Sequence, residues 1–281
     1  MRGNDANLEL TETQKQRLTE LGGDGFSELR FLNANERDKK FDELERGLVK
    51  KNKQGLLTLL GSTRRPTLRQ IERELSQALI DAHFTEVLTP SIISRESIMR
   101  MGITESHGLW KQIYWVDSKR CLRPMLAPSL YHVMRELRRI ITPVSIFEVG
   151  SCFRKESKGR EHAEEFTMLN AVELAPRKDT GERLKEMVDI CLSAVGMRNY
   201  EFRKVESEVY GETIDVLVDD FEVASAVLGP HPLDRNWLVV DPWAGVGFGL
   251  ERLAMVRKRC QNLGHVGRSL SHLDGSSLDV M

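Results

Sequence analysis

The feature that most limits the fold is a series of apolar segments of strand length between residues 84 and 248. These segments are bounded by turn residues and cover 84–88, 145–149, 151–156, 165–173, 200–205, 213–218, 222–228 and 244–248. They outnumber the helical segments that could serve as crossovers between parallel strands. The pattern therefore predicts an α+β fold in which helices flank a mainly antiparallel sheet.

Helical segments precede and interrupt this series. Capping boxes, a proline suited to a first turn and apolar residues at helical spacing predict them at 11–22, 27–53, 67–82, 129–141, 179–195 and from about residue 250. Residues 61–66 contain a glycine and a proline that interrupt the helical pattern. We therefore expect a small helical appendage over 1–65 and one larger domain over 66–281.

The composition is that of a soluble globular protein, with 40% hydrophobic and 30% charged residues. No run approaches the roughly 20 apolar residues that span a bilayer, and the first residues lack the apolar core of a signal peptide. We therefore expect a cytoplasmic protein with no membrane partner. The four cysteines are scattered and form no C-x-x-C pair, so we expect no zinc site.

Two stretches of the chain carry basic residues and no acid, although the net charge is only −1. One runs from Arg46 to Ile71 and the other from Arg252 to Leu273. Such stretches can hold a polyanion through phosphate contacts, and the alternative is a solvated helix face. Two of them in a nearly neutral chain favour nucleic acid.

Three further segments carry the residues on which the functional interpretation depends. The first is the helix and strand that end at Pro90. The second is Phe-Arg-Lys-Glu at 153–156, followed by a polar loop that joins two strands into a long antiparallel hairpin, and the third is GVGFGLER at 245–252. A G-x-G-x-G pattern alone is weak, because it often marks close packing of a strand on a helix. In this order and combination, the segments resemble the three signature motifs of class II aminoacyl-tRNA synthetases.

This resemblance implies an ATP-dependent ligase that activates an amino acid and transfers it to tRNA. Activation brings two anions together, so the site needs fixed cations and magnesium more than it needs a base. The resemblance assigns catalysis to Arg154 and Arg252, and ATP binding to these two with Glu156, His162, Phe166, Glu222 and Ser225. Glu222 and Ser225 stand where the class places magnesium ligands, with a serine in place of the second acid that many relatives have.

The amino-acid pocket is expected between the helix after Pro128 and the strand after Phe166. Its candidate lining is Ala127, Leu130, Tyr131, Met134, Asn170, Val172, Tyr210 and Trp243, with Tyr210 on a segment that relatives use as a mobile lid. The strings around these residues resemble a member of the class whose substrate is a lysine acylated on its side-chain nitrogen by a bulky ring. The lining contains no acid, so free lysine should be rejected and Asn170 should read the amide.

The same resemblance suggests partners. The motif that ends at Pro90 packs across the two-fold axis in this class, so we expect a homodimer. Only 29 residues follow Arg252 (281 minus 252), too few for an anticodon-binding domain, and no Cys/His cluster precedes residue 83. We therefore expect a catalytic subunit that acts with a separate tRNA-binding protein on an amber-suppressor tRNA. The residues expected to contact tRNA are Lys50, Lys51, Lys53, Arg64 and Arg65.

Two alternatives remain open from the sequence. One is a phenylalanyl-like class II synthetase with an apolar pocket. The other is a non-catalytic synthetase paralogue that binds RNA as a regulator. Such paralogues usually lose a motif arginine or glutamate, and this chain keeps Arg154, Glu156 and Arg252.

Overall fold

The computed structural model describes residues 8–155 and 163–281, and the chain divides into two compact units. The helical unit comprises Met1–Thr67 with Gly264–Met281, and the sheet unit comprises Leu68–Leu263. The sequence had assigned 264–281 to the larger domain. These residues instead group with the helical unit, where the backbone N–H of Ser277 donates to the buried Asn52 side chain at 2.8 Å.

The sheet unit is built on one seven-stranded sheet in the order β1-β4-β5-β9-β8-β7-β6. Every neighbouring pair is antiparallel except β1 and β4, which confirms the predicted mainly antiparallel α+β fold. The strands are β1 Thr85–Glu86, β4 Val144–Phe153, β5 Glu165–Leu174, β6 Glu201–Ser207, β7 Gly211–Val218, β8 Phe221–Gly229 and β9 Trp243–Gly249. A two-stranded ribbon, β2 Ile92–Ser94 with β3 Arg120–Leu122, lies outside the large sheet.

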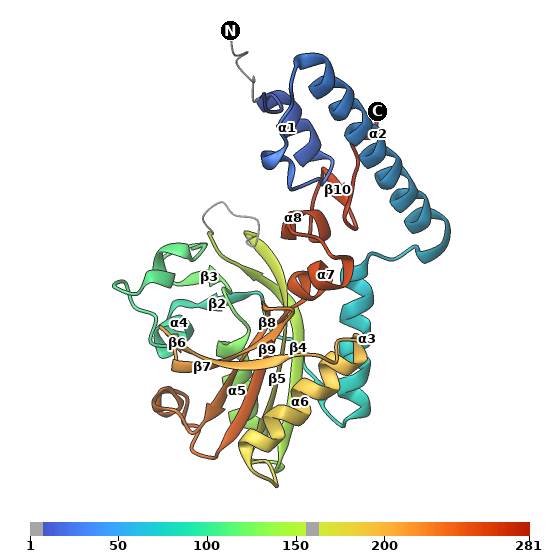
Figure 1. Ribbon diagram of the computed structural model, residues 1–281. Coiled ribbons are helices and arrows are strands. Elements are labelled where there is room, and N and C mark those ends of the chain that lie inside the picture. The colour runs from blue at the N-terminus through green and yellow to red at the C-terminus, as the bar shows by residue number, and fades with distance from the viewer. Residues whose placement is uncertain (1–7, 156–162) are drawn as a thin grey trace. The chain divides into compact units, whose positions relative to one another are not determined.

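Helices cover both faces of the large sheet. The helices of this unit are α3 Thr67–Asp81, α4 Arg95–Arg100, α5 Ala127–Leu137, α6 Thr180–Ala194 and α7 Leu250–Lys258, with short 3₁₀ helices η3 Gly108–Gln112 and η4 Pro232–Trp237. In Figure 1, α6 lies in front of the sheet and α5 behind it. The face toward α5 is the one that matters for function.

The long hairpin expected after residue 145 is present, but the two strands predicted on either side of Gly150 form the single strand β4. Gly150 remains in register opposite Met168. Its lack of a side chain leaves room for Arg123, because a Cβ there would lie 1.9 Å from the Arg123 guanidinium. The glycine therefore marks a close approach within a continuous strand rather than a turn.

The helical unit contains α1 Glu12–Glu20, the 3₁₀ helix η1 Phe26–Glu28, α2 Ala34–Thr58, the π-helical turn η2 Leu59–Thr63, α8 Leu263–Val266 at the division, and the strand pair β10 His272–Leu273 and β11 Ser276–Ser277. The predicted Thr11–Gln14 capping box is present at the start of α1. Helix α2 begins later than expected because Asn33 caps it by accepting from Glu36 N–H. No helix in the described part of the chain is long and apolar enough to cross a bilayer.

Candidate active site

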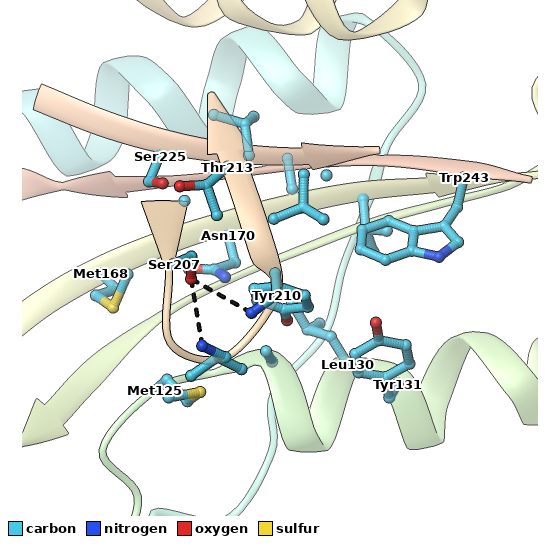
Figure 2. Close-up of a pocket in the computed structure, with 18 of the residues that line it drawn as sticks. Met125, Leu130, Tyr131, Met168, Asn170, Ser207, Tyr210, Thr213, Ser225 and Trp243 are labelled. Atoms are coloured by element: carbon cyan, nitrogen blue, oxygen red, sulfur yellow. Dashed lines mark hydrogen bonds between the residues drawn. The ribbon is translucent and has the colours of Figure 1, made fainter. Parts of the chain in front are cut away.

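A cavity of about 430 Å³ lies on the α5 side of the sheet. Strands β5, β8 and β9 form its floor, α5 forms one wall, and the tip of the β6–β7 hairpin covers it (Figure 2). All the residues predicted for the amino-acid pocket line this cavity: Ala127, Leu130, Tyr131, Met134, Asn170, Val172, Tyr210 and Trp243. The structure therefore brings these residues together around one cavity, and their contact with an amino acid stays a prediction.

A row of ladder partners crosses the floor of this cavity. Asp215 on β7 is opposite Ser225 on β8, Ser225 is opposite Gly247 on β9, and Gly247 is opposite Asn170 on β5. Directly opposed residues on neighbouring strands point to the same face, so the row presents polar groups into one cavity. A Cβ on Gly247 would lie 3.0 Å from Asn170 Oδ1, so a larger residue there would crowd the Asn170 amide.

Asn170 has the side chain expected of a group that reads a substrate. Its Oδ1 atom is buried and has no hydrogen-bond partner among the described residues. Buried polar atoms are nearly always paired, so an unpaired amide oxygen on a cavity floor points to a missing ligand or water. Phe166, Met168 and Asn170 share one face of β5, as strand alternation predicted, and line the two cavities described here.

One wall of the cavity is fixed by Asp234, which is only 2% exposed. Its carboxylate accepts from Tyr131 Oη at 2.7 Å, from Trp243 Nε1 at 2.9 Å and from the backbone N–H of His231 at 2.6 Å. Burial, with the Tyr210 hydroxyl and the Asp234 carboxylate nearby, raises the pKa of Tyr131, so its hydroxyl keeps its proton and donates. The two aromatic side chains are therefore held in place before any substrate arrives.

The cavity is not free of acids, contrary to the expected lining. Asp215 and Glu206 are also on its surface. Asp215 lies opposite Ser225 at one end of the floor, whereas Tyr131 and Trp243 surround Asp234 elsewhere on the wall. Strand pairing between β7 and β8 brings Asp215 in, and this pairing was not assigned residue by residue from the sequence.

A second cavity of about 260 Å³ adjoins the first and contains most of the residues predicted to bind ATP. Arg154, Phe166, Glu222, Ser225 and Arg252 all line it. Arg154 and Ser225 line both cavities, so the two form one site with Arg154 at the junction. Glu156 and His162, the other two predicted ATP contacts, lie outside the described residues.

Both motif arginines are anchored by fixed partners. Arg154 donates from Nε to the Pro124 carbonyl at 2.9 Å, and its guanidinium carbon lies 5.2 Å from the centre of the Phe166 ring. Arg252 forms an ion pair of 2.8 Å with Glu222. For Arg154, this anchoring places positive charge in the cavity without the entropy cost of ordering a free side chain during the reaction.

The oxygen groups beside this ion pair match the chemistry of magnesium. Glu222, Ser225 and Asp215 offer two carboxylates and a hydroxyl, and Mg²⁺ prefers oxygen ligands. Burial and the neighbouring Glu222 raise the pKa of Asp215, while the Ser225 hydroxyl opposes this by hydrogen bonding. Among the described residues, no group of three or more His, Cys, Asp or Glu side chains could hold a metal by itself.

The residues predicted to contact tRNA lie in the helical unit. Lys50, Lys51 and Lys53 are exposed on α2, and Arg64 and Arg65 follow η2. In the second basic stretch, two of the five basic residues are paired within the sheet unit: Arg252 with Glu222 at 2.8 Å and Arg257 with Glu74 at 2.6 Å. The three lysines of the first stretch therefore reach solvent on one helix, and their contact with tRNA stays a prediction.

Sequence reasoning missed Asp215 and Asp234. Asp215 belongs to the string YGETIDV, where it alternates with Thr213 on the strand and thus shares its face. That signal could have placed it in the site. Asp234 follows Leu233 in the short 3₁₀ helix η4, and nothing in the local pattern indicates that this acid is buried and accepts from three donors.

Comparison with known proteins adds three findings. Residues 59–228 match the family model described as the phenylalanyl tRNA synthetase beta chain CLM domain. The chain is similar to the crystal structure of pyrrolysyl-tRNA synthetase from Desulfitobacterium hafniense, with 44% identity and a TM-score of 0.90 over 97% of this chain and 99% of that one. A second structure from that organism, PylSc, a pyrrolysyl tRNA synthetase, gives 43% identity and a TM-score of 0.89 over 99% and 98% of the two chains.

Proposed function

The chain belongs to the pyrrolysyl-tRNA synthetase family, and we propose that it activates pyrrolysine with ATP and transfers it to the 3′-terminal ribose of an amber-suppressor tRNA. It is a class II aminoacyl-tRNA ligase, as the three motifs predicted. The observation that carries the proposal is the continuity of the two cavities. An apolar cavity with an unpaired amide joins a cavity with two anchored arginines, and Arg154 lines both.

Activation joins the contents of the two cavities. A carboxylate oxygen of the amino acid attacks the α-phosphorus of ATP, and the bond to the bridging oxygen breaks so that pyrophosphate leaves. Arg154 lies where the two anions meet, so it neutralises their repulsion and the charge that develops on the phosphorus oxygens. Arg252 supports the nucleotide from the neighbouring cavity when its ion pair with Glu222 opens to receive phosphate.

Magnesium fits the oxygen groups of the second cavity. Glu222 and Ser225 would hold the ion, with Asp215 beside them as the second acid that the Glu–Ser pair lacks. When bound, the ion neutralises phosphate charge and orients the leaving group. We propose no zinc site, because the four cysteines are scattered along the chain and form no C-x-x-C pair.

The amino-acid cavity suits a long side chain that ends in an amide and a bulky ring. Leu130, Met134, Val172 and Trp243 supply apolar surface, and Asn170 can pair with the substrate amide through a group that otherwise lacks a partner. Lysine would carry an unmasked ammonium into this surface. Asp215 lies opposite Ser225, which lines the cavity together with Arg154, so we expect Asp215 near the substrate carboxylate and not near the end of the side chain. Glu206 is the other acid on the cavity surface, and it lies on the exposed hairpin strand β6. Lysine should therefore be a poor substrate.

tRNA is the macromolecular partner that membership of this family requires. We assign its binding in part to Lys50, Lys51, Lys53, Arg64 and Arg65 of the helical unit, where the chain has an acid-free run. A separate tRNA-binding protein and a cytoplasmic location complete the proposal. The separate protein would be unnecessary if this chain alone charged its tRNA at a rate that no added partner increased.

A homodimer is supported by exposed apolar residues around the first motif. Leu88 is 91% exposed, Ile92 46% and Met99 48%, and Pro90 lies among them. A cluster of this kind on a folded chain commonly marks an interface. Sedimentation equilibrium tests the assignment, and a monomer at micromolar concentration would contradict it.

Amino-acid-dependent exchange of pyrophosphate with ATP tests the function directly. We expect exchange with pyrrolysine, little with lysine and little with phenylalanine. Exchange driven by phenylalanine would favour the phenylalanyl-like alternative, to which the family model gives some weight. Absence of exchange with any amino acid, in a folded protein that binds tRNA, would favour the non-catalytic paralogue.

A further inference from the structure

The tip of the β6–β7 hairpin is contacted by two histidines from different parts of the sheet unit. His107 Nε2 lies 3.3 Å from the Glu208 carbonyl oxygen, and His231 Nε2 contacts the Tyr210 carbonyl oxygen. The tip itself is a tight turn in which Ser207 Oγ accepts from the N–H groups of residues 209 and 210, drawn as dashed lines in Figure 2. Two backbone carbonyls of one turn are therefore bonded from two separate loops.

The two histidines are built alike. Each is the N-cap of a short 3₁₀ helix, His107 of η3 and His231 of η4. In each, Nδ1 accepts from the backbone N–H two residues later: Leu109 at 3.1 Å for His107 and Leu233 at 3.2 Å for His231. A neutral imidazole has one N–H, so a ring that accepts at Nδ1 carries its proton on Nε2. The Nε2–H group of each histidine can then donate to the carbonyl oxygen of the hairpin tip, which can only accept. The hydrogen bond at Nδ1 therefore selects the tautomer that binds the hairpin.

Both histidines stand on loops that are fixed by aromatic packing and hydrogen bonds. In η4, the His231 N–H is bonded to the buried Asp234, and Trp237 stacks on Tyr131 with ring centres 5.4 Å apart. In η3, Trp110 packs on Trp115 with ring centres 4.6 Å apart. A Cβ on Gly108 would lie 3.2 Å from the Glu208 carboxylate, so η3 also meets the tip sterically.

Besides the two histidines, the tip is supported by the packing of its Val209 and Tyr210 side chains against the core, whereas the strand that leads to it is not. Most of β6 is exposed, and an exposed hairpin belongs to the least stable parts of a fold. The side chains of Val209 and Tyr210 nevertheless line the amino-acid cavity. The Tyr210 ring also packs edge-on against the His231 ring, with centres 5.5 Å apart.

We propose that His107 and His231 are positioning residues that clasp the hairpin tip over the amino-acid cavity, and so set how tightly the bound amino acid and its adenylate are enclosed. The inference rests on the proposed function, because it assumes that the cavity holds the amino acid. The geometry assigns each histidine one hydrogen bond to the lid and one to its own loop. Loss of either clasp should let the tip open more often without changing the groups that perform the chemistry.

The test uses the full chain with His107→Ala, His231→Ala and the double variant. Hydrogen exchange of the amides at 206–212 without substrate should accelerate in each single variant and most in the double. The KM for pyrrolysine in pyrophosphate exchange should rise about fivefold per clasp, the scale of one lost hydrogen bond. The kcat should change less than KM, because Arg154 and Arg252 are untouched. His107→Gln and His231→Gln should largely restore both readouts, because the glutamine Nε2 reaches the same carbonyl as a donor.

The exposed His83, at the turn after α3, provides the matched control as His83→Asn. Wild-type exchange of the hairpin amides in both folded alanine variants would overturn the clasp. Faster hydrogen exchange of these amides, with an unchanged KM for pyrrolysine and an unchanged rate of adenylate release, would overturn the role of the clasp in enclosing the substrate. If His231→Ala melts early, the glutamine variants and His107→Ala decide the matter. Hydrogen exchange needs no substrate, so failure of the proposed function would leave this measurement intact.

Discussion

The sheet unit and the helical unit differ in the charged groups that we assign to function. The sheet unit contains a fully enclosed charged pair beside the site: Arg123 and Glu148 form a 2.7 Å ion pair with 3% and 0% of their side chains exposed. In the helical unit, Lys50, Lys51 and Lys53 extend from α2 into solvent. Buried charges with fixed positions interact strongly with a reacting centre that fits between them. Solvated cations attract a polyanion by long-range electrostatics and need no fixed geometry. If this difference is functional, mutations in the two units should affect different steps.

The largest effect is expected from Arg154→Ala. Arg154 is anchored on the Pro124 carbonyl at the junction of the two cavities, where two anions meet. Its loss should remove at least about 2–3 kcal/mol of transition-state stabilisation, the scale of a lost preorganised donor. Pyrophosphate exchange measures the loss, and filter binding should show unchanged tRNA affinity. Near-normal exchange by the folded variant would remove Arg154 from catalysis.

An intermediate effect is expected from Asn170→Ala. The Asn170 Oδ1 atom has no described partner, so removal of the side chain leaves the rest of the protein without a new unpaired group. We expect a folded variant that loses about 1–3 kcal/mol of pyrrolysine recognition. Activation of phenylalanine relative to pyrrolysine should also increase, because the enlarged cavity no longer contains a polar group that must pair with a substrate amide.

Melting temperature and exchange rates with both amino acids separate this interpretation from a structural one. An asparagine that only supports the core would give a less stable protein with the same substrate preference. Val172→Ala, a buried apolar change on the same strand, is the matched control for cavity size.

The smallest effect on activation, and one confined to tRNA, is expected from replacing Lys50, Lys51 and Lys53 with alanine. Binding of tRNA should weaken, and the dependence of log K on log salt should become shallower by about one per lost phosphate contact. Activation of pyrrolysine should be unchanged. Lys39→Ala with Lys40→Ala removes charge from the same helix outside the acid-free run and serves as the control. Parallel loss of both activities in the triple variant would erase the distinction between the units.

The long strands and helices of the sheet unit were predictable because their patterns are local. Alternation and period-3.6 spacing depend on nearby residues, so β5, β8, β9, α5 and α6 all appear close to their expected ranges. Gly150 misled the prediction, since its role is to admit Arg123 from a distant segment. The short elements between residues 92 and 122 were missed because turns and tertiary contacts determine them more than periodicity does.

The site divides in the same manner. Arg154, Phe166 and Arg252 could be placed in one cavity because the motifs that contain them are contiguous, and the class II identity drawn from those motifs is confirmed. The position of Asp215 depends on strand register, and that of Asp234 depends on the contact of η4 with Tyr131 of α5, which no local spacing encodes. The contacts of His107 and His231 with the hairpin tip could not be predicted from local patterns either, because each joins residues more than 20 positions apart: 101 for His107 and 21 for His231.

The Asp234 cluster has a consequence for how the substrate range of this protein can change. Tyr131 and Trp243 shape the cavity and also donate to a buried carboxylate, so shortening either one leaves that charge with fewer donors. Met134 and Val172 line the same cavity, and their apolar side chains make no hydrogen bond to Asp234. Laboratory evolution toward larger amino acids should therefore tolerate change first at Met134 and Val172. Substitutions at Tyr131 or Trp243 should be retained mainly when a second substitution at Asp234 removes the carboxylate that has lost its donor.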